Sequence, residues 1–247
     1  MNKLHKVQST DVENEIPTEI VGILGGLGPE TSSKFMADLI SMATTDRRPA
    51  VCHWNLPLNL KKEQEFIATG AHKDHYRLLL THGARALEKA GCTRLVMPCN
   101  TVHEFHDELR RIVAVPFPNL IEVVAHEIQR RCWGTVLLLA TSRTIQTCLY
   151  QRVLSKLGIE AVVPDVGDQK KVDLLVQGLL GDGDVEQSEK LLSEMVDFAG
   201  VDNVVLGCTD LQLVFHPSEK VIDSMQCLVN DTVNVLLGGG QRTGYKV

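Results

Sequence analysis

The sequence has few aromatic residues and no excess of positive charge. Phe, Trp and Tyr make up 4% of its 247 residues, and 25 Lys and Arg stand against 31 Asp and Glu, which gives a net charge of −6. Domains that bind nucleic acids usually carry a basic surface, and those that bind single strands add aromatic side chains on which bases stack. We therefore expect no nucleic-acid partner.

Long apolar runs are also missing. No stretch approaches the roughly 18 apolar residues that a membrane helix needs, and residues 1–17 are polar, without the apolar segment of a secretory signal. The cysteines number seven, an odd count, and are scattered along the chain. This usage is typical of reduced thiols. We expect a cytoplasmic protein with no membrane partner.

Motifs for metals and cofactors are absent as well. The sequence contains neither a His-Glu-x-x-His nor a Cys-x-x-Cys pattern. The turn at residues 25–28 lacks the third glycine of a dinucleotide fingerprint, and no phosphate-loop lysine follows it. We expect no metal and no cofactor. The histidine pairs that a metal site could recruit, each spaced i, i+3, are His72/His75 and His103/His106.

Short apolar runs alternate with amphipathic segments along the chain. A strand candidate at 19–24 leads into a glycine turn and a helix over 30–45, and the alternation continues to residue 237. This pattern predicts an α/β fold with parallel sheets in two similar lobes. Pro116 and Pro118 interrupt it and mark the boundary. The expected parts are a mobile leader at 1–18, a first lobe at 19–117 plus 224–237, a second lobe at 118–223 and a disordered tail at 238–247.

Two stretches of the sequence echo each other. Residues 96–103 and 205–211 each contain an apolar run, a small or rigid residue, a cysteine, and a threonine within the next two positions. Buried parallel strands appear as apolar runs, and their carboxyl ends open into the crevice where ligands bind. A single cysteine is more often a small buried hydrophobe. The repeated context instead favours Cys99 and Cys208 as functional thiols that face one cleft.

Two thiols in one cleft suggest proton transfer on opposite faces of a carbon atom. One thiol would act as a thiolate base while its partner acts as the acid. Asn100 belongs to the residue types that begin helices, and a helix N-terminus lowers a thiol pKa from its usual value of about 8.5, so we expect a partly ionised thiol. Candidate donors to the charge that develops on a substrate carboxylate are Gly26, Leu27, Gly28, Asn100, Thr101 and Thr209.

Three motifs together resemble the cofactor-independent aspartate/glutamate racemase family. They are Ile-Leu-Gly-Gly-Leu-Gly-Pro-Glu at 23–30, Met-Pro-Cys-Asn-Thr-Val-His at 97–103 and Leu-Gly-Cys-Thr-Asp at 206–210. The resemblance extends over residues 19–237, nearly the whole chain. It implies two pseudo-symmetric Rossmann-like lobes with the active site in the cleft between them, and Cys99 and Cys208 as acid/base thiols. It also implies a small acidic amino acid as substrate, no pyridoxal phosphate, and commonly a homodimer.

Other positions are carried over from the family less directly. The segment at 140–144 is similar to the family's strand-end segment beside the substrate, which suggests Thr141 and Thr144 as binding residues. Lys170 stands where the family often places a lysine that meets a substrate carboxylate. Each also has a plain structural interpretation, because Thr141 could only cap the following helix and Lys170 could lie on a solvated helix face. His103 and Asp210 are candidates for tuning the neighbouring thiols.

The sequence departs from the family at two places. After the second strand the family usually has an Asp-Arg pair, whereas this chain has Lys61 and Lys62, and lysine does not reproduce the fork of a guanidinium group. Asp210 stands where glutamate is more common. The polar segment at 59–70 that contains these lysines is expected to form an active-site lid.

The leading hypothesis is a racemase that inverts aspartate, glutamate or a related small acidic amino acid through two thiols. Relatives of the same shape suggest maleate cis–trans isomerisation with one cysteine as nucleophile, hydantoin racemisation, or a decarboxylation with a single catalytic cysteine. Outside catalysis, the chain could bind a carboxylate without converting it. Exchange of the Cα proton distinguishes these possibilities.

Overall fold

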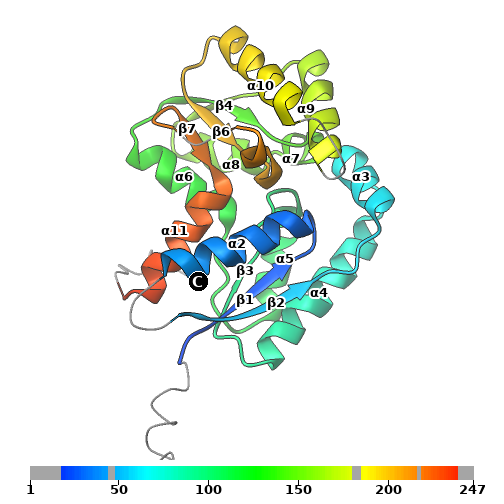
Figure 1. The fold of residues 1–247 in the computed structure, drawn as a ribbon, viewed down its shortest axis with the longest axis vertical. Coiled ribbons are helices and arrows are strands. Elements are labelled where there is room, and N and C mark those ends of the chain that lie inside the picture. The colour runs from blue at the N-terminus through cyan, green and yellow to red at the C-terminus, as the bar shows by residue number, and fades with distance from the viewer. Residues whose placement is uncertain (1–17, 44–47, 180–184, 216–217, 239–247) are drawn as a thin grey trace, which may run out of the picture.

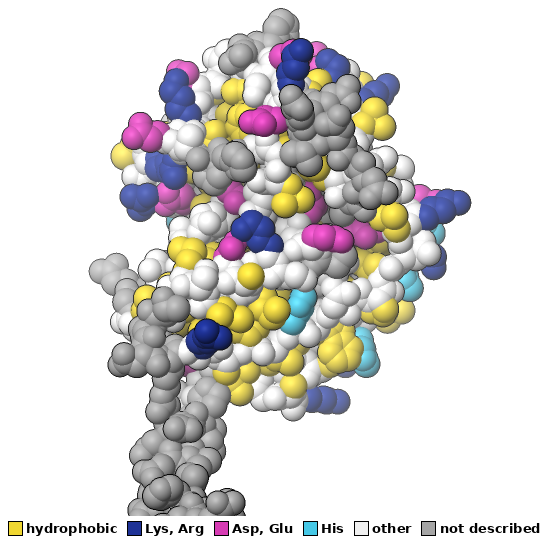
Figure 2. Space-filling view, viewed as in Figure 1, with side chains coloured by type: hydrophobic (Ala, Val, Ile, Leu, Met, Phe, Trp, Pro, Cys, Tyr) yellow, Lys and Arg dark blue, Asp and Glu magenta, His cyan; other side chains and the backbone are white. Residues whose placement is uncertain are grey.

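A computed structural model describes residues 18–43, 48–179, 185–215 and 218–238 of the chain (Figure 1, Figure 2). Two parallel sheets, each accompanied by helices, occupy the lower and upper halves of this view. The predicted leader at 1–18 and tail at 238–247 lie, apart from one residue each, outside the described residues.

The first sheet has the strand order β2-β1-β3, and every neighbouring pair is parallel. β1 (Ile20–Gly25) is buried along nearly its whole length, as its continuous apolar run predicts. β2 (Ala50–Asn55) and β3 (Arg94–Val96) flank it. The helical segments of this half are α2 (Pro29–Met42), α3 (Leu60–Thr69), α4 (Lys73–Lys89), η1 (Thr101–Phe105) and α5 (His106–Ile112).

The second sheet has the order β5-β4-β6-β7 and is also parallel. Its strands are β4 (Thr135–Leu139), β5 (Glu160–Val162), β6 (Val204–Leu206) and β7 (Val221–Asp223). Its helical segments are α6 (Leu120–Arg130), α7 (Ser142–Gln146), α8 (Leu149–Lys156), α9 (Val166–Leu179), α10 (Val185–Ala199) and η2 (Thr209–Leu213). The last helix, α11 (Ser224–Leu236), follows β7 and packs on helices of both halves. The predicted α/β fold with parallel sheets is confirmed. None of the helices in the described ranges is both long enough and apolar enough to cross a bilayer.

The two halves share a continuous apolar core. One buried cluster includes Val21 and Ile23 of β1 together with Val136 and Leu138 of β4. α11 packs against both α6 and α2, and α3 packs against α7. In Figure 1, α11 runs between the two sheets and α3 lies where the halves meet. The division into lobes at 19–117 plus 224–237 and at 118–223 remains our proposal.

Two segments have a local structure that the sequence pattern did not specify. The expected lid at 59–70 is the regular helix α3: the Asn59 side chain accepts hydrogen bonds from the first backbone N–H groups, and Gly70, with φ of 74°, ends the helix. The chain from Ser142 to Lys156 forms two helices, α7 and α8, rather than one. Cys148 separates them because it adopts a left-handed backbone with φ of 53°.

Candidate active site

Cys99 and Cys208 follow equivalent strands of the two sheets. β3 ends at Val96 and β6 ends at Leu206, so each thiol comes shortly after the carboxyl end of a parallel strand and before a 3₁₀ helix, η1 or η2. Cys208 is 6% exposed, and Cys99 is partly buried. Cys99 contributes electrostatically to the raised pKa of Cys208. The two sheets therefore bring one thiol each to a common site.

Both thiols are held in the protonated form. Burial raises the pKa of Cys99 to about 12, and the backbone N–H groups of Val102 and Thr101 offset this only in part. Burial also raises the pKa of Cys208 well above its usual range, and the negative charge of Asp210 raises it further. The prediction of a partly ionised thiol is wrong for the ligand-free protein, because desolvation outweighs the few amide groups of a 3₁₀ turn.

Asp210 connects the Cys208 thiol to the first lobe. Its Oδ2 atom accepts a hydrogen bond from Cys208 Sγ, 3.6 Å away, and its Oδ1 atom accepts one from the hydroxyl group of Thr31 in α2. Burial raises the pKa of Asp210, while these two hydrogen bonds lower it. Gly28, with φ of +68°, leaves room for this contact, since a Cβ atom there would lie 2.8 Å from Oδ1. A proton acceptor thus lies directly beside one thiol.

The glycine turn joins β1 to α2 and brings the backbone close to its neighbours. Gly26 has φ of +112°, and a Cβ atom there would lie 2.4 Å from the backbone nitrogen of Leu56. The Leu27 side chain is 5% exposed and belongs to the core of the first lobe. The Gly28 N–H group donates to Glu63 Oε1 at 2.9 Å. The role of this turn in substrate binding remains a prediction, because the Gly28 amide has an internal partner.

Sequence reasoning missed Glu63. Its side chain is buried, with the residue 4% exposed, although it belongs to a polar helix. Its pKa is raised to about 7, mainly by burial and also by the charges of Asp210 and Glu30, against the lowering effect of the Gly28 N–H group. A helical interpretation of 60–69 would have found it, because Glu63 shares the buried face of α3 with Phe66 and Ile67.

Three buried threonine hydroxyl groups connect the lobes. Thr101 of η1 lies 3.0 Å from Thr141 between their Oγ1 atoms, and Thr141 lies 3.0 Å from Thr144 Oγ1. The Thr144 hydroxyl also donates to Thr101 at 3.3 Å, which closes a triangle. Thr141 begins α7 by accepting the Thr144 N–H group at 3.2 Å. The structure brings these predicted binding residues together, and their contact with substrate remains a prediction.

Asn100 makes a second polar contact between the lobes. Its Nδ2 atom donates to Ser224 Oγ at 2.9 Å, and its Oδ1 atom accepts from the Tyr150 hydroxyl group at 2.6 Å. Tyr150 and Ser224 were not found from the sequence, because no local pattern links either residue to Cys99. Both side-chain groups of Asn100 therefore support the backbone that follows the first thiol.

His103 contacts the backbone of Cys99 rather than its thiol. The Leu120 N–H group donates to Nε2 at 3.0 Å, so the proton lies on Nδ1, which donates to the Cys99 carbonyl oxygen at 2.7 Å. Burial lowers the pKa of His103 to about 3, and the nearby His106 lowers it as well. His103 is thus a neutral, fixed ring that positions the segment carrying Cys99.

The comparisons with known proteins agree with this geometry. The sequence model of the Asp/Glu/Hydantoin racemase family matches residues 24–232. The chain belongs to this family. It is 27% identical to the broad specificity amino-acid racemase RacX of Bacillus subtilis strain 168 over 230 residues, which cover 88% of this chain and 98% of that protein. The predicted amino-acid racemase, an isomerase, is confirmed at this level.

Two solved structures show how far the similarity extends. An aspartate racemase homologue from Pyrococcus horikoshii OT3 is 25% identical, with a TM-score of 0.72, and the match covers 89% of this chain and 99% of that chain. Picrophilus torridus aspartate racemase is also 25% identical, with a TM-score of 0.74, and the match covers 88% and 94% of the two chains. The fold therefore corresponds along nearly its whole length.

The lysines that the sequence offered as partners for a substrate carboxylate are exposed. Lys170 is exposed on α9, whereas its neighbour Gln169 donates to the Ala140 carbonyl oxygen at 2.9 Å. Lys61 and Lys62 are exposed on α3. Thr209 is 2% exposed at the start of η2. Substrate contacts of Lys170 and Thr209 remain predictions.

An ion-pair group joins η1 to α7 across the lobes. Arg143 binds the carboxylate of Glu104 at 2.6 Å and 3.0 Å, and Lys73 binds the same carboxylate at 2.9 Å. The Glu104 side chain is 4% exposed, and the Arg143 side chain is 16% exposed. The Nε and Nη2 atoms of Arg143 are therefore used by Glu104, and because Lys73 shares the same carboxylate, the three residues keep a net positive charge.

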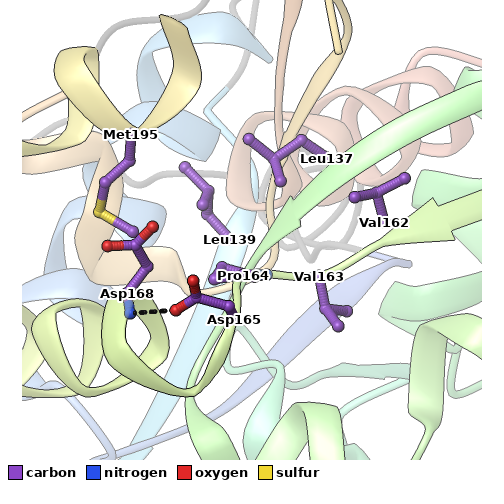
Figure 3. A pocket seen from close by; sticks show the side chains of 8 residues that line it. All are labelled: Leu137, Leu139, Val162, Val163, Pro164, Asp165, Asp168 and Met195. Atoms are coloured by element: carbon purple, nitrogen blue, oxygen red, sulfur yellow. Dashed lines mark hydrogen bonds between the residues drawn. The ribbon is translucent and has the colours of Figure 1, made fainter. Parts of the chain in front are cut away.

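Two cavities are candidates for ligand space. One, of about 150 Å³, lies beside the glycine turn and is lined by Gly26, Asn55 and Glu63 among others. The other, of about 200 Å³, lies in the second half of the racemase, with Leu139 and Met195 among its lining residues (Figure 3). Neither cysteine is among the residues that line either cavity. The first is the candidate active-site space because Glu63 in its wall binds the Gly28 N–H group, and Gly28 lies against Asp210, the partner of Cys208. Within the described ranges, no three or more His, Cys, Asp or Glu residues form a cluster that could hold a metal ion.

Proposed function

We propose that the protein interconverts the enantiomers of an α-amino acid by moving protons between Cα and two thiols, without a cofactor. The observation that carries this proposal is the placement of Cys99 and Cys208 after the corresponding strands β3 and β6 of the two sheets, with Asp210 linking Cys208 to Thr31 of the first sheet's half. Membership of the racemase family and the names of the relatives support an amino-acid substrate.

Proton transfer can begin at the Cys208–Asp210 pair. The Asp210 carboxylate accepts the Cys208 thiol proton, and the resulting thiolate removes the proton from Cα on its side. The Cys99 thiol then donates its proton to the opposite face of the carbanion, which leaves Cys99 as a thiolate. Return of one proton from the Asp210 carboxyl group to Cys99 through solvent restores the resting state. The other enantiomer follows the opposite order.

The burial of both thiols is consistent with this order of events. Each thiol is protonated before substrate binds, so a thiolate forms only where a base or a bound ammonium group favours it. Hydroxyl groups of the inter-lobe threonines and backbone N–H groups near the cysteines are fixed dipoles that could stabilise charge on the substrate carboxylate. Single-cysteine alternatives, such as maleate isomerisation or decarboxylation, give the second thiol no role.

The finer predictions from the sequence remain predictions. An acidic amino acid as substrate, a homodimer and a cytoplasmic location are each implied by the resemblance or by composition. Among the described residues, the cations nearest this region are Arg143 and Lys73, which share the Glu104 carboxylate.

Single replacements test the two thiols. Cys99→Ser and Cys208→Ser are each expected to reduce racemisation by about a hundredfold or more, because each removes one of two proton-transfer groups. Cys148→Ser, which changes an exposed thiol away from the site, is the matched control. Chiral chromatography of the reaction mixture gives the rates. Full activity in either active-site variant contradicts the proposal.

A further inference from the structure

The cavity beside the glycine turn opens where a parallel sheet binds its ligands. Gly26 follows β1, Asn55 ends β2, Glu30 lies in the first turn of α2 and Glu63 comes from α3, and all four line a space of about 150 Å³. The cavity therefore lies at the carboxyl ends of β1 and β2, which are parallel. Glu63 Oε1 accepts the Gly28 N–H group, and Gly28 lies against Asp210 Oδ1, whose carboxylate binds the Cys208 thiol, so the cavity adjoins the thiol site.

The cavity wall is apolar, and its charged residues are both acidic. Leu56, Leu58 and Leu60 form the wall, and Leu60 is 48% exposed, which leaves apolar surface uncovered. Glu30 and Glu63 supply the charges, and no Lys or Arg is among the described lining residues. A methylene chain suits such a wall, and a cation suits such charges.

Glu63 lacks a counter-ion within the described part of the chain. Its carboxylate accepts the Gly28 N–H group at 2.9 Å, and its charged neighbours, Asp210 and Glu30, are both acidic. A buried carboxylate surrounded by like charges is unfavourable until a cation approaches it. A substrate ammonium group would relieve this repulsion, whereas a substrate carboxylate would add to it.

We propose that this cavity receives the substrate side chain and that Glu63 selects an amino acid whose side chain carries a cation on a methylene stem, as in lysine or ornithine. This inference rests on the proposed two-thiol racemase function. It makes Glu63 a specificity-determining residue, and it replaces the dicarboxylic substrate that the family resemblance implies.

Competing substrates measure this selectivity directly. The wild-type enzyme is assayed on lysine, ornithine, methionine, aspartate and glutamate, with kcat/KM for each obtained by chiral chromatography. We expect higher kcat/KM for lysine and ornithine than for aspartate and glutamate. In Glu63→Gln the ratio of kcat/KM for lysine to that for methionine, a neutral side chain of similar length, should fall by about tenfold to a hundredfold. Glu65→Gln, an exposed position on the same helix, should leave this ratio unchanged.

Two results would overturn the proposal. One is a wild-type preference for aspartate or glutamate. The other is an equal loss on every substrate in Glu63→Gln, which would mean that Glu63 binds the α-ammonium group common to them all. If the wild-type enzyme racemises none of the five, the two-thiol function fails. Calorimetric titration with lysine and with glutamate then tests the selectivity. Weaker lysine binding to Glu63→Gln than to the wild-type protein supports it, and equal lysine binding to the two proteins contradicts it.

Discussion

Asp210 accepts hydrogen bonds from Cys208, whose Sγ atom lies 3.6 Å away, and from Thr31. Because Thr31 belongs to the first lobe and Cys208 to the second, this carboxylate places a proton acceptor at a contact between the two lobes. Its charge raises the pKa of Cys208 and also that of Cys99. One acidic residue thus acts on both thiols.

Replacing Asp210 should separate its two effects. Asp210→Asn removes a negative charge, so the pKa of Cys208 should fall and alkylation of this thiol by iodoacetamide should begin at lower pH. The same change removes the proton acceptor, so kcat should fall by about tenfold to a hundredfold. Mass spectrometry of the alkylated peptides gives the pH dependence of each cysteine. Asp202→Asn, at an exposed position, is the control. An unchanged midpoint for Cys208 would show that the contact has no electrostatic effect.

His103 should make the protein sensitive to acid. A histidine with a lowered folded-state pKa contributes stability that is present above its usual pKa of 6.5 and is lost as the pH falls toward about 3. The free energy of unfolding should therefore fall with pH below 6.5, by up to about 1.4 kcal/mol per pH unit for this one proton. His103→Asn should reduce that slope, as measured by urea unfolding between pH 7 and pH 4. An equal slope in both proteins would argue against a neutral buried ring, and His75→Asn on the surface serves as the comparison.

The ion pair between Glu104 and Arg143 should contribute more to the free energy of unfolding than an exposed ion pair does. Glu104→Gln leaves a largely buried guanidinium group without its carboxylate and should lower the free energy of unfolding by about 3 kcal/mol. Asp202→Asn breaks the exposed pair with Lys220 and should cost less than about 1 kcal/mol. Urea unfolding of the two variants measures both values. Equally small losses would mean that solvent screens the inter-lobe pair.

Much of the fold could be predicted because its signals are local. The buried strand β1 has a continuous apolar run, and the glycine turn after it contains positions that only glycine fills without strain. The strand ends before Cys99 and Cys208 could be found in the same way, since equivalent strands carry similar sequences. These features depend on neighbours in the sequence rather than on distant contacts.

The rest of the site depends on long-range contacts. Burial by the surrounding structure raises the thiol pKa values, whereas the local helix-start pattern predicted that a thiol pKa would be lowered. The partners of His103 include the Leu120 amide, which no spacing rule connects to it. Glu63 was missed because 59–70 was interpreted as a polar lid segment, and without a helix there is no buried face to which a residue can be assigned.

Incorporation of deuterium at Cα tests the two-thiol claim most directly. The enzyme is incubated in D₂O with one pure enantiomer, lysine first and then the other amino acids, and the reaction is stopped at low conversion. Substrate and product are separated, and their deuterium content is measured by mass spectrometry. With separate groups on the two faces, the product should carry solvent deuterium while the recovered substrate stays almost entirely protiated. Equal deuterium in both from the start would show that a single group serves both faces, and would contradict the account.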